Sequence, residues 1–156
     1  MNIKYTEILN FSKDRFFSIF VSLIGLLWGC SPSETVRNPH LNDTPFQVEV
    51  NLNLPQYDAL RFAGGALYVN QGGIQGLLIL NLNGNQFLAW EASCANHPIE
   101  SCSRLSIEGV LANCQCAHQA QYSLATGQWL NATGENAYPL LNYTTRLNGN
   151  ILRISN

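Results

Sequence analysis

Charged side chains are scarce in this 156-residue chain, in which eight Lys and Arg stand against ten Asp and Glu. Both lysines, Lys4 and Lys13, lie near the N-terminus, and from Cys30 onward five Arg and eight acidic residues give a formal charge of −3. Without clustered Lys and Arg the chain has no basic surface for phosphates, which excludes nucleic acid as a partner. A hydrophobic content of 46% excludes a disordered chain.

Long helical patterns and long apolar runs are also missing. Only residues 56–62 look helical, and this stretch is too short to set the fold class. The longest apolar run, residues 16–27, is shorter than the about 20 residues that a membrane-spanning helix needs. The spacing of Ser, His, Asp and Glu supports neither a catalytic triad nor a carboxylate pair, so we expect no catalytic residues of a hydrolase.

The first thirty residues are typical of an export signal. Basic residues precede the apolar run, and Leu27-Trp28-Gly29-Cys30 follows it. Cysteine directly after Leu-x-Gly resembles a bacterial lipobox, so we expect a lipoprotein signal peptide at 1–29, lipidation of Cys30 and a flexible tether over 30–45. An uncleaved membrane anchor is the alternative. Either way we expect the bacterial cell envelope, at the outer membrane and facing the periplasm or the cell surface, where conditions are oxidising.

Short strands and turns fill the rest of the chain. Residues 46–54 alternate apolar and polar side chains, which is the pattern of a strand with one buried face. Asn83-Gly84-Asn85 and Asn148-Gly149 are hairpin turn signals. The other expected strands are 66–69, 76–82, 86–91, 106–113, 120–124, 128–130, 143–147 and 151–155. We therefore predict an all-β domain over 46–156, a small antiparallel barrel or sandwich of about nine short strands.

Four cysteines and two histidines share one 25-residue window: Cys94, His97, Cys102, Cys114, Cys116 and His118. If the two Cys–His units lie on loops at the end of adjacent hairpins, two thiolates and two imidazoles meet. That donor set suits a 2Fe–2S centre, with sulfur on one iron and nitrogen on the other. It also suits tetrahedral zinc. In an exported domain, four cysteines equally suit two disulfides, for which three pairings exist.

The same window resembles the Rieske family, in which a Cys-x-His loop and a Cys-x-x-His loop hold the cluster. Tyr122 and Gly127 follow His118 at the family's spacing, and Tyr138-Pro139-Leu140 matches its segment before the last hairpin. The resemblance covers about 46–156, and the chain is similar to Rieske-like lipoproteins found in Bacteroidota. Its first loop is one residue longer than the family pattern, with Asn96 at the place of the ligand histidine, and Gln115 takes the place of the second ligand cysteine.

The resemblance implies an envelope lipoprotein that binds a 2Fe–2S cluster and transfers electrons to a membrane partner. One iron would be held by Cys94 and either Cys114 or Cys116, of which we expect Cys116 to be the metal ligand, and the other by His97 and His118. The alternative is a cluster-free structural or interaction module with disulfides among Cys94, Cys102, Cys114 and Cys116. We expect neither form to be a self-contained enzyme.

Overall fold

The computed structural model describes residues 37–42, 44–133 and 137–156. It divides the chain into two units, Met1–Val36 and Arg37–Asn156, of which the second contains all the described residues. The expected signal peptide and lipidation site lie outside the described residues. No helix in the described ranges is long and apolar enough to cross a membrane.

The described residues form nine strands and one short 3₁₀ helix, which confirms the prediction of an all-β fold. In chain order they are β1 (Gln47–Asn51), η2 (Pro55–Arg61), β2 (Ala66–Val69), β3 (Leu77–Asn81), β4 (Phe87–Glu91), β5 (Ser106–Glu108), β6 (Leu111–Asn113), β7 (Gln121–Ser123), β8 (Asn142–Asn148) and β9 (Ile151–Ser155).

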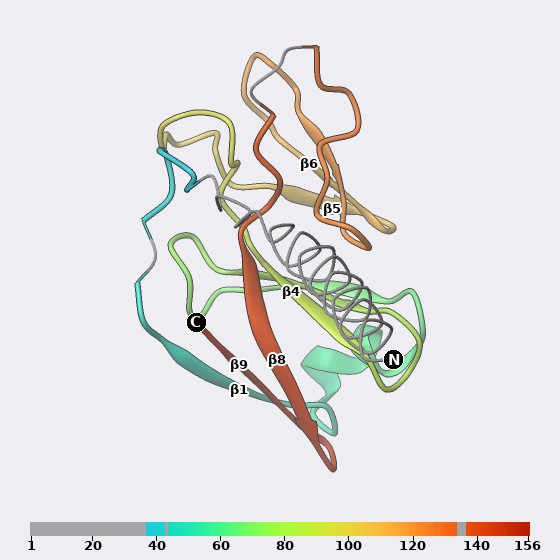
Figure 1. Cartoon of the computed structure of the whole chain (residues 1–156). Helices are drawn as coiled ribbons and strands as arrows, with labels where there is room; N and C mark the ends of the chain where they lie inside the picture. The colour runs from blue at the N-terminus through green and yellow to red at the C-terminus, as the bar shows by residue number, and fades with distance from the viewer. Residues whose placement is uncertain (1–36, 43, 134–136) are drawn as a thin grey trace, which may run out of the picture. The chain divides into compact units, whose positions relative to one another are not determined.

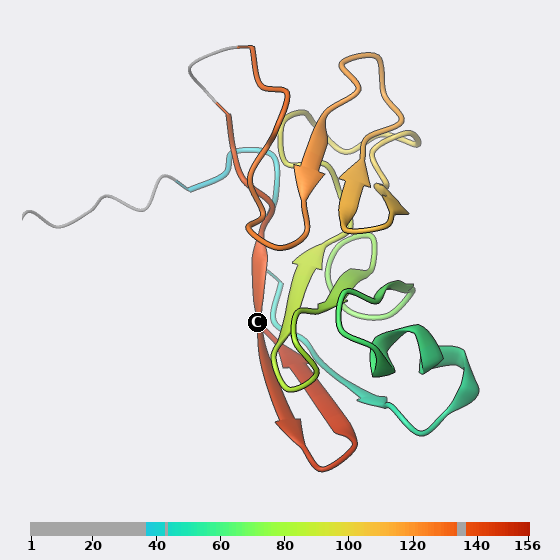
Figure 2. The same cartoon turned by 90° about the vertical axis from the view of Figure 1, so that its right-hand side faces the viewer.

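The strands form two antiparallel sheets. The larger has six strands in the order β1-β9-β8-β4-β3-β2, and the smaller has three in the order β5-β6-β7. Pairing is antiparallel throughout. Hairpins produce most of these pairs, whereas β1–β9 and β4–β8 join strands that are far apart in the sequence. Figures 1 and 2 show the small sheet at one end of the unit and the β8–β9 hairpin projecting at the other.

Strand β3 is buried on both faces, which explains its unbroken apolar sequence. Leu78 and Leu80 face one cluster of buried residues, and Leu77 and Ile79 face another. Successive side chains of a strand point to opposite faces, so this single strand contributes to both cores. The first cluster includes Cys94 and Cys114, and it therefore connects the large sheet with the end of the molecule that carries the cysteines.

Two expected strands differ from the structure. Residues 106–113 form a hairpin, β5 and β6, because Gly109 adopts a φ of 60° and turns the chain. Residues 128–130 contribute only an isolated bridge between Tyr122 and Trp129.

The compact unit also begins before Phe46, the residue at which we expected the domain to start. Leu41 is buried, and the side-chain amide of Asn38 donates to the carbonyl oxygen of Ala95 at 2.8 Å. Both residues belong to the segment expected as tether, so the described end of that segment packs on the domain.

Candidate metal centre

Two loops at the same end of the domain carry the cysteines and histidines. The first follows β4 and is closed at its base by the bridge between Ser93 and Arg104 and by the hydrogen bond from Cys94 N to Ser103 O, at 2.8 Å. The second joins β6 to β7 and is closed by the hydrogen bond from Cys114 N to Ala120 O, also at 2.8 Å. Each base holds a cysteine directly after a paired residue, Ser93 or Asn113, while the histidines are more exposed than the cysteines.

The second loop contains backbone in an uncommon conformation. Gln119 has a φ of 45°, and among the described residues it is the one non-glycine residue with positive φ. The side-chain amide of Asn131 donates to its carbonyl oxygen at 3.0 Å and holds the turn from outside. Unfavourable backbone conformations persist only where surrounding contacts enforce them, and they are common at functional sites.

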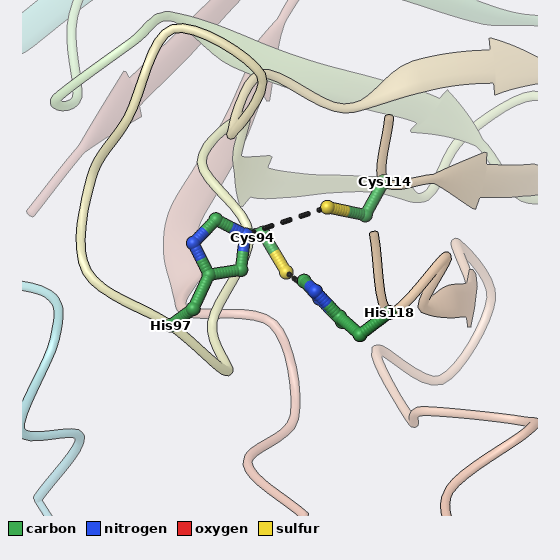
Figure 3. Close-up of side chains that lie close together, drawn as sticks. All are labelled: Cys94, His97, Cys114 and His118. Atoms are coloured by element: carbon green, nitrogen blue, oxygen red, sulfur yellow. Dashed lines mark hydrogen bonds between the residues drawn. The ribbon is translucent and has the colours of Figure 1, made fainter. Parts of the chain in front are cut away.

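Four side chains from these loops converge: Cys94, His97, Cys114 and His118 (Figure 3). One donor atom of each lies within 4.8 Å of the other three. The sulfur of Cys94 is 3.3 Å from Nε2 of His118, and the sulfur of Cys114 is 3.5 Å from Nε2 of His97. Contacts therefore cross between the loops, with each cysteine next to the histidine of the other loop.

The other two described cysteines form a disulfide, Cys102–Cys116, with an S–S distance of 2.07 Å. It joins the two loops covalently. In the described part of the chain, Cys94 and Cys114 are the cysteines outside a disulfide. Of the two residues considered for the second thiol ligand, the structure thus brings Cys114 to the group and ties the sulfur of Cys116, the expected metal ligand, to Cys102.

The two thiols are more deeply buried than the two imidazoles. Cys94 is fully buried and Cys114 is 4% exposed, whereas His97 is partly exposed and His118 exposed. The two histidine rings lie edge to face with their centroids 4.6 Å apart. The group therefore has a sulfur side toward the core and a nitrogen side toward the surface.

Burial governs the protonation of Cys114 and His118. The pKa of Cys114 is raised to about 11, chiefly by burial, with a backbone hydrogen bond at Cys116 lowering it and the adjacent Cys94 raising it. Partial burial of the ring lowers the pKa of His118, and the neighbouring His97 lowers it as well. At neutral pH Cys114 is thus a thiol and His118 a neutral imidazole, which presents a free nitrogen lone pair.

Tyr122 is a further member of the site that the sequence pattern did not reveal as such. Its hydroxyl oxygen lies 3.2 Å from the sulfur of Cys94, and its side chain is fully buried. Burial raises the pKa of Tyr122 strongly, so the phenol stays protonated. Its position four residues after His118 matches the Rieske spacing, but the sequence alone does not indicate a contact with Cys94.

No family model matches the chain, and no curated protein matches it. Among solved structures, a chain in the complex of reduced oxygenase and oxidized ferredoxin in carbazole 1,9a-dioxygenase is similar, with a TM-score of 0.43 and 22% sequence identity. The match covers 60% of this chain and 90% of that chain.

Proposed function

We propose that this chain is a Rieske-like electron carrier whose 2Fe–2S cluster is held by Cys94 and Cys114 on one iron and by His97 and His118 on the other. The observation that carries the proposal is the convergence of two free thiols and two imidazoles from two loops, with the other two cysteines held in a disulfide. Two thiolates and two imidazoles are the ligand set of this cluster type.

The division of the donors by depth supports the cluster. Sulfur donors lie together toward the core and nitrogen donors lie together toward the surface, which matches a centre with one sulfur-bound and one nitrogen-bound iron. When bound, the cluster supplies a one-electron redox centre. Buried Cys94 and Cys114 exclude water from its inner side, and exposed His118 leaves its outer side accessible to a partner.

Tetrahedral zinc is the second candidate, and the spacing of the donors favours it. Zinc bonds of about 2.3 Å to sulfur and about 2.0 Å to nitrogen place these two ligand atoms about 3.5 Å apart. The two Cys–His contacts of 3.3 and 3.5 Å are close to that value. Sulfur and nitrogen on different irons are farther apart, so cluster binding must open both contacts. The partly exposed His97 and the exposed His118, however, suit electron exchange with a partner, which a purely structural zinc site does not need.

Visible spectroscopy of the protein made with iron–sulfur assembly intact tests the proposal. We expect a brown protein, and His118→Ala should remove the colour because it opens the nitrogen-bound iron to solvent. His40→Ala is the matched control, since His40 lies outside the four-residue group and should leave the colour unchanged. A colourless wild-type protein contradicts the cluster and leaves zinc or the cluster-free module, which the Cys102–Cys116 disulfide favours.

The cellular setting is part of the same proposal. We infer that Cys30 carries a lipid and that the domain lies in the bacterial cell envelope, where it exchanges electrons with a membrane protein. The lipobox-like segment and the disulfide support this, because disulfides persist in oxidising compartments.

A further inference from the structure

The side-chain amide of Asn96, in the first loop, has a fixed orientation. Its Oδ1 accepts a hydrogen bond from the backbone N–H of Tyr138 at 2.8 Å, and its Nδ2 donates to the carbonyl oxygen of Tyr138 at 2.8 Å. A backbone N–H can only donate and a carbonyl can only accept. The reversed amide would lose both bonds, so Nδ2 is the atom that faces the rest of the site.

That same Nδ2 contacts the hydroxyl of Tyr122, with 2.7 Å between the nitrogen and the oxygen. An amide NH₂ cannot accept a hydrogen bond, so the hydroxyl oxygen accepts from Asn96. The hydroxyl hydrogen is then left for the other side-chain atom within reach, the sulfur of Cys94 at 3.2 Å. Tyr122 is fully buried, which keeps water from competing for that hydrogen.

We propose that Asn96 is a positioning residue that directs the Tyr122 hydroxyl hydrogen onto the sulfur of Cys94. A hydrogen bond donated to a ligand sulfur stabilises its negative charge and raises the reduction potential of the metal centre that the sulfur holds. This redox consequence rests on the proposed function, whereas the orientation of the hydroxyl is a property of the protein alone. The position at which the Rieske pattern has a ligand histidine thus acts on the centre through Tyr122.

Proton NMR of the metal-free, isotope-labelled protein tests the orientation itself. In the wild type we expect a slowly exchanging hydroxyl proton of Tyr122, with a nuclear Overhauser contact to the side-chain amide protons of Asn96. In Asn96→Leu, which keeps a similar size and loses the donor, the hydroxyl proton should exchange faster. If the wild-type amide protons of Asn96 show no contact with Tyr122, the proposal is overturned, whatever metal the protein binds.

Redox titration of the cluster-loaded protein tests the consequence with a double-variant cycle. Asn96→Leu and Tyr122→Phe should each lower the midpoint potential, and the double variant should show no shift beyond that of Tyr122→Phe. Asn142→Leu is the matched control, because the Asn142 amide bonds the carbonyl oxygen of Ala89 instead of the site. An Asn96→Leu shift that persists in the Tyr122→Phe background overturns the positioning role.

Asn96→Asp provides a second variant in case the leucine side chain disturbs folding. An ionised carboxylate can only accept, so the Tyr122 hydroxyl should turn toward Asp and leave the Cys94 sulfur without its donor. The midpoint potential should then fall, and an unchanged potential would overturn the proposal. If the protein takes up no cluster at all, the proposed function fails and the NMR experiment decides on Asn96 independently.

Discussion

Glu91, at the end of β4, is the one charged side chain among the described residues with no exposed surface. Its carboxylate accepts hydrogen bonds from the backbone of Ile74 at 2.6 Å, Gln75 at 2.9 Å and Ser93 at 2.8 Å. The hydroxyl of Tyr143 donates to it as well, at 2.8 Å. These donors compensate the loss of water around the charge and fix the start of the first loop of the metal centre.

Glu91→Gln should therefore destabilise the domain by about 3 kcal/mol, because an amide has one acceptor atom and its NH₂ group would face backbone donors. Urea unfolding monitored by circular dichroism measures the change. Glu49→Gln is the control: its ion pair with Arg153 is about half exposed, and its loss should cost no more than about 1 kcal/mol. Equal effects of the two substitutions would argue against the role given to Glu91.

Proton release on metal binding is the second prediction at this scale. With a pKa of about 11, Cys114 is protonated in the metal-free protein at neutral pH and must lose its proton to become a ligand. Affinity for zinc should thus rise as the pH increases from 6 to 8. Because the pKa of His118 is lowered, protons compete with the metal for its imidazole only below the pH range in which histidine usually titrates. An indicator dye in weak buffer should record fewer protons released for Cys114→Ser than for the wild type, and equal release would contradict this account.

At the scale of elements, the disulfide Cys102–Cys116 connects the loop after β4 with the loop between β6 and β7. It closes a segment with a sequence separation of 14, for which the loss of unfolded-state entropy contributes about 3 kcal/mol. The disulfide also holds the two loops together, so that each cysteine stays next to the histidine of the other loop.

Cys102→Ser with Cys116→Ser should lower the free energy of unfolding by about 3 kcal/mol and weaken metal binding. Thermal and urea unfolding with and without reductant measure the first effect, and metal competition with a chelator measures the second. Reductant should destabilise the wild type and leave the double variant unchanged. A double variant as stable as the oxidised wild type would show that other contacts hold the loops together.

Local patterns in the sequence predicted most of these elements. The alternation in residues 46–54 and the Asn-Gly turns located β1, the β3–β4 hairpin and the β8–β9 hairpin, because period and turn chemistry are local properties. The β5–β6 turn was missed, since a single glycine, Gly109, reverses the chain there without an adjacent Asn, Asp or Pro to indicate a turn.

The site was predictable only in part. The window from Cys94 to His118 contains all four converging residues, but the choice between Cys114 and Cys116 depends on which sulfur faces Cys102 across the loops. The contact between Tyr122 and Cys94 and the burial of Glu91 are likewise tertiary. Spacing along the chain does not determine such long-range contacts.

For the whole molecule, we predict attachment to a membrane through a lipid. The lipobox-like segment predicts that the mature protein begins at Cys30 with a lipid on its sulfur. Mass spectrometry of the protein from membranes should show that modified N-terminus, and Cys30→Ser should abolish the lipid. Detection of an intact Met1 would instead indicate an uncleaved anchor, and cleavage elsewhere would remove the lipoprotein assignment.

Metal analysis of the unit Arg37–Asn156, combined with a thiol count, determines what the metal centre contains. We expect about two iron and two sulfide per chain. After denaturation without reductant and removal of the metal, the free thiols should be those of Cys94 and Cys114. About one zinc per chain with the same two thiols would place a single ion between the loops. A metal-free protein with no free thiol would contradict the account, because Cys94 and Cys114 would then form a second disulfide.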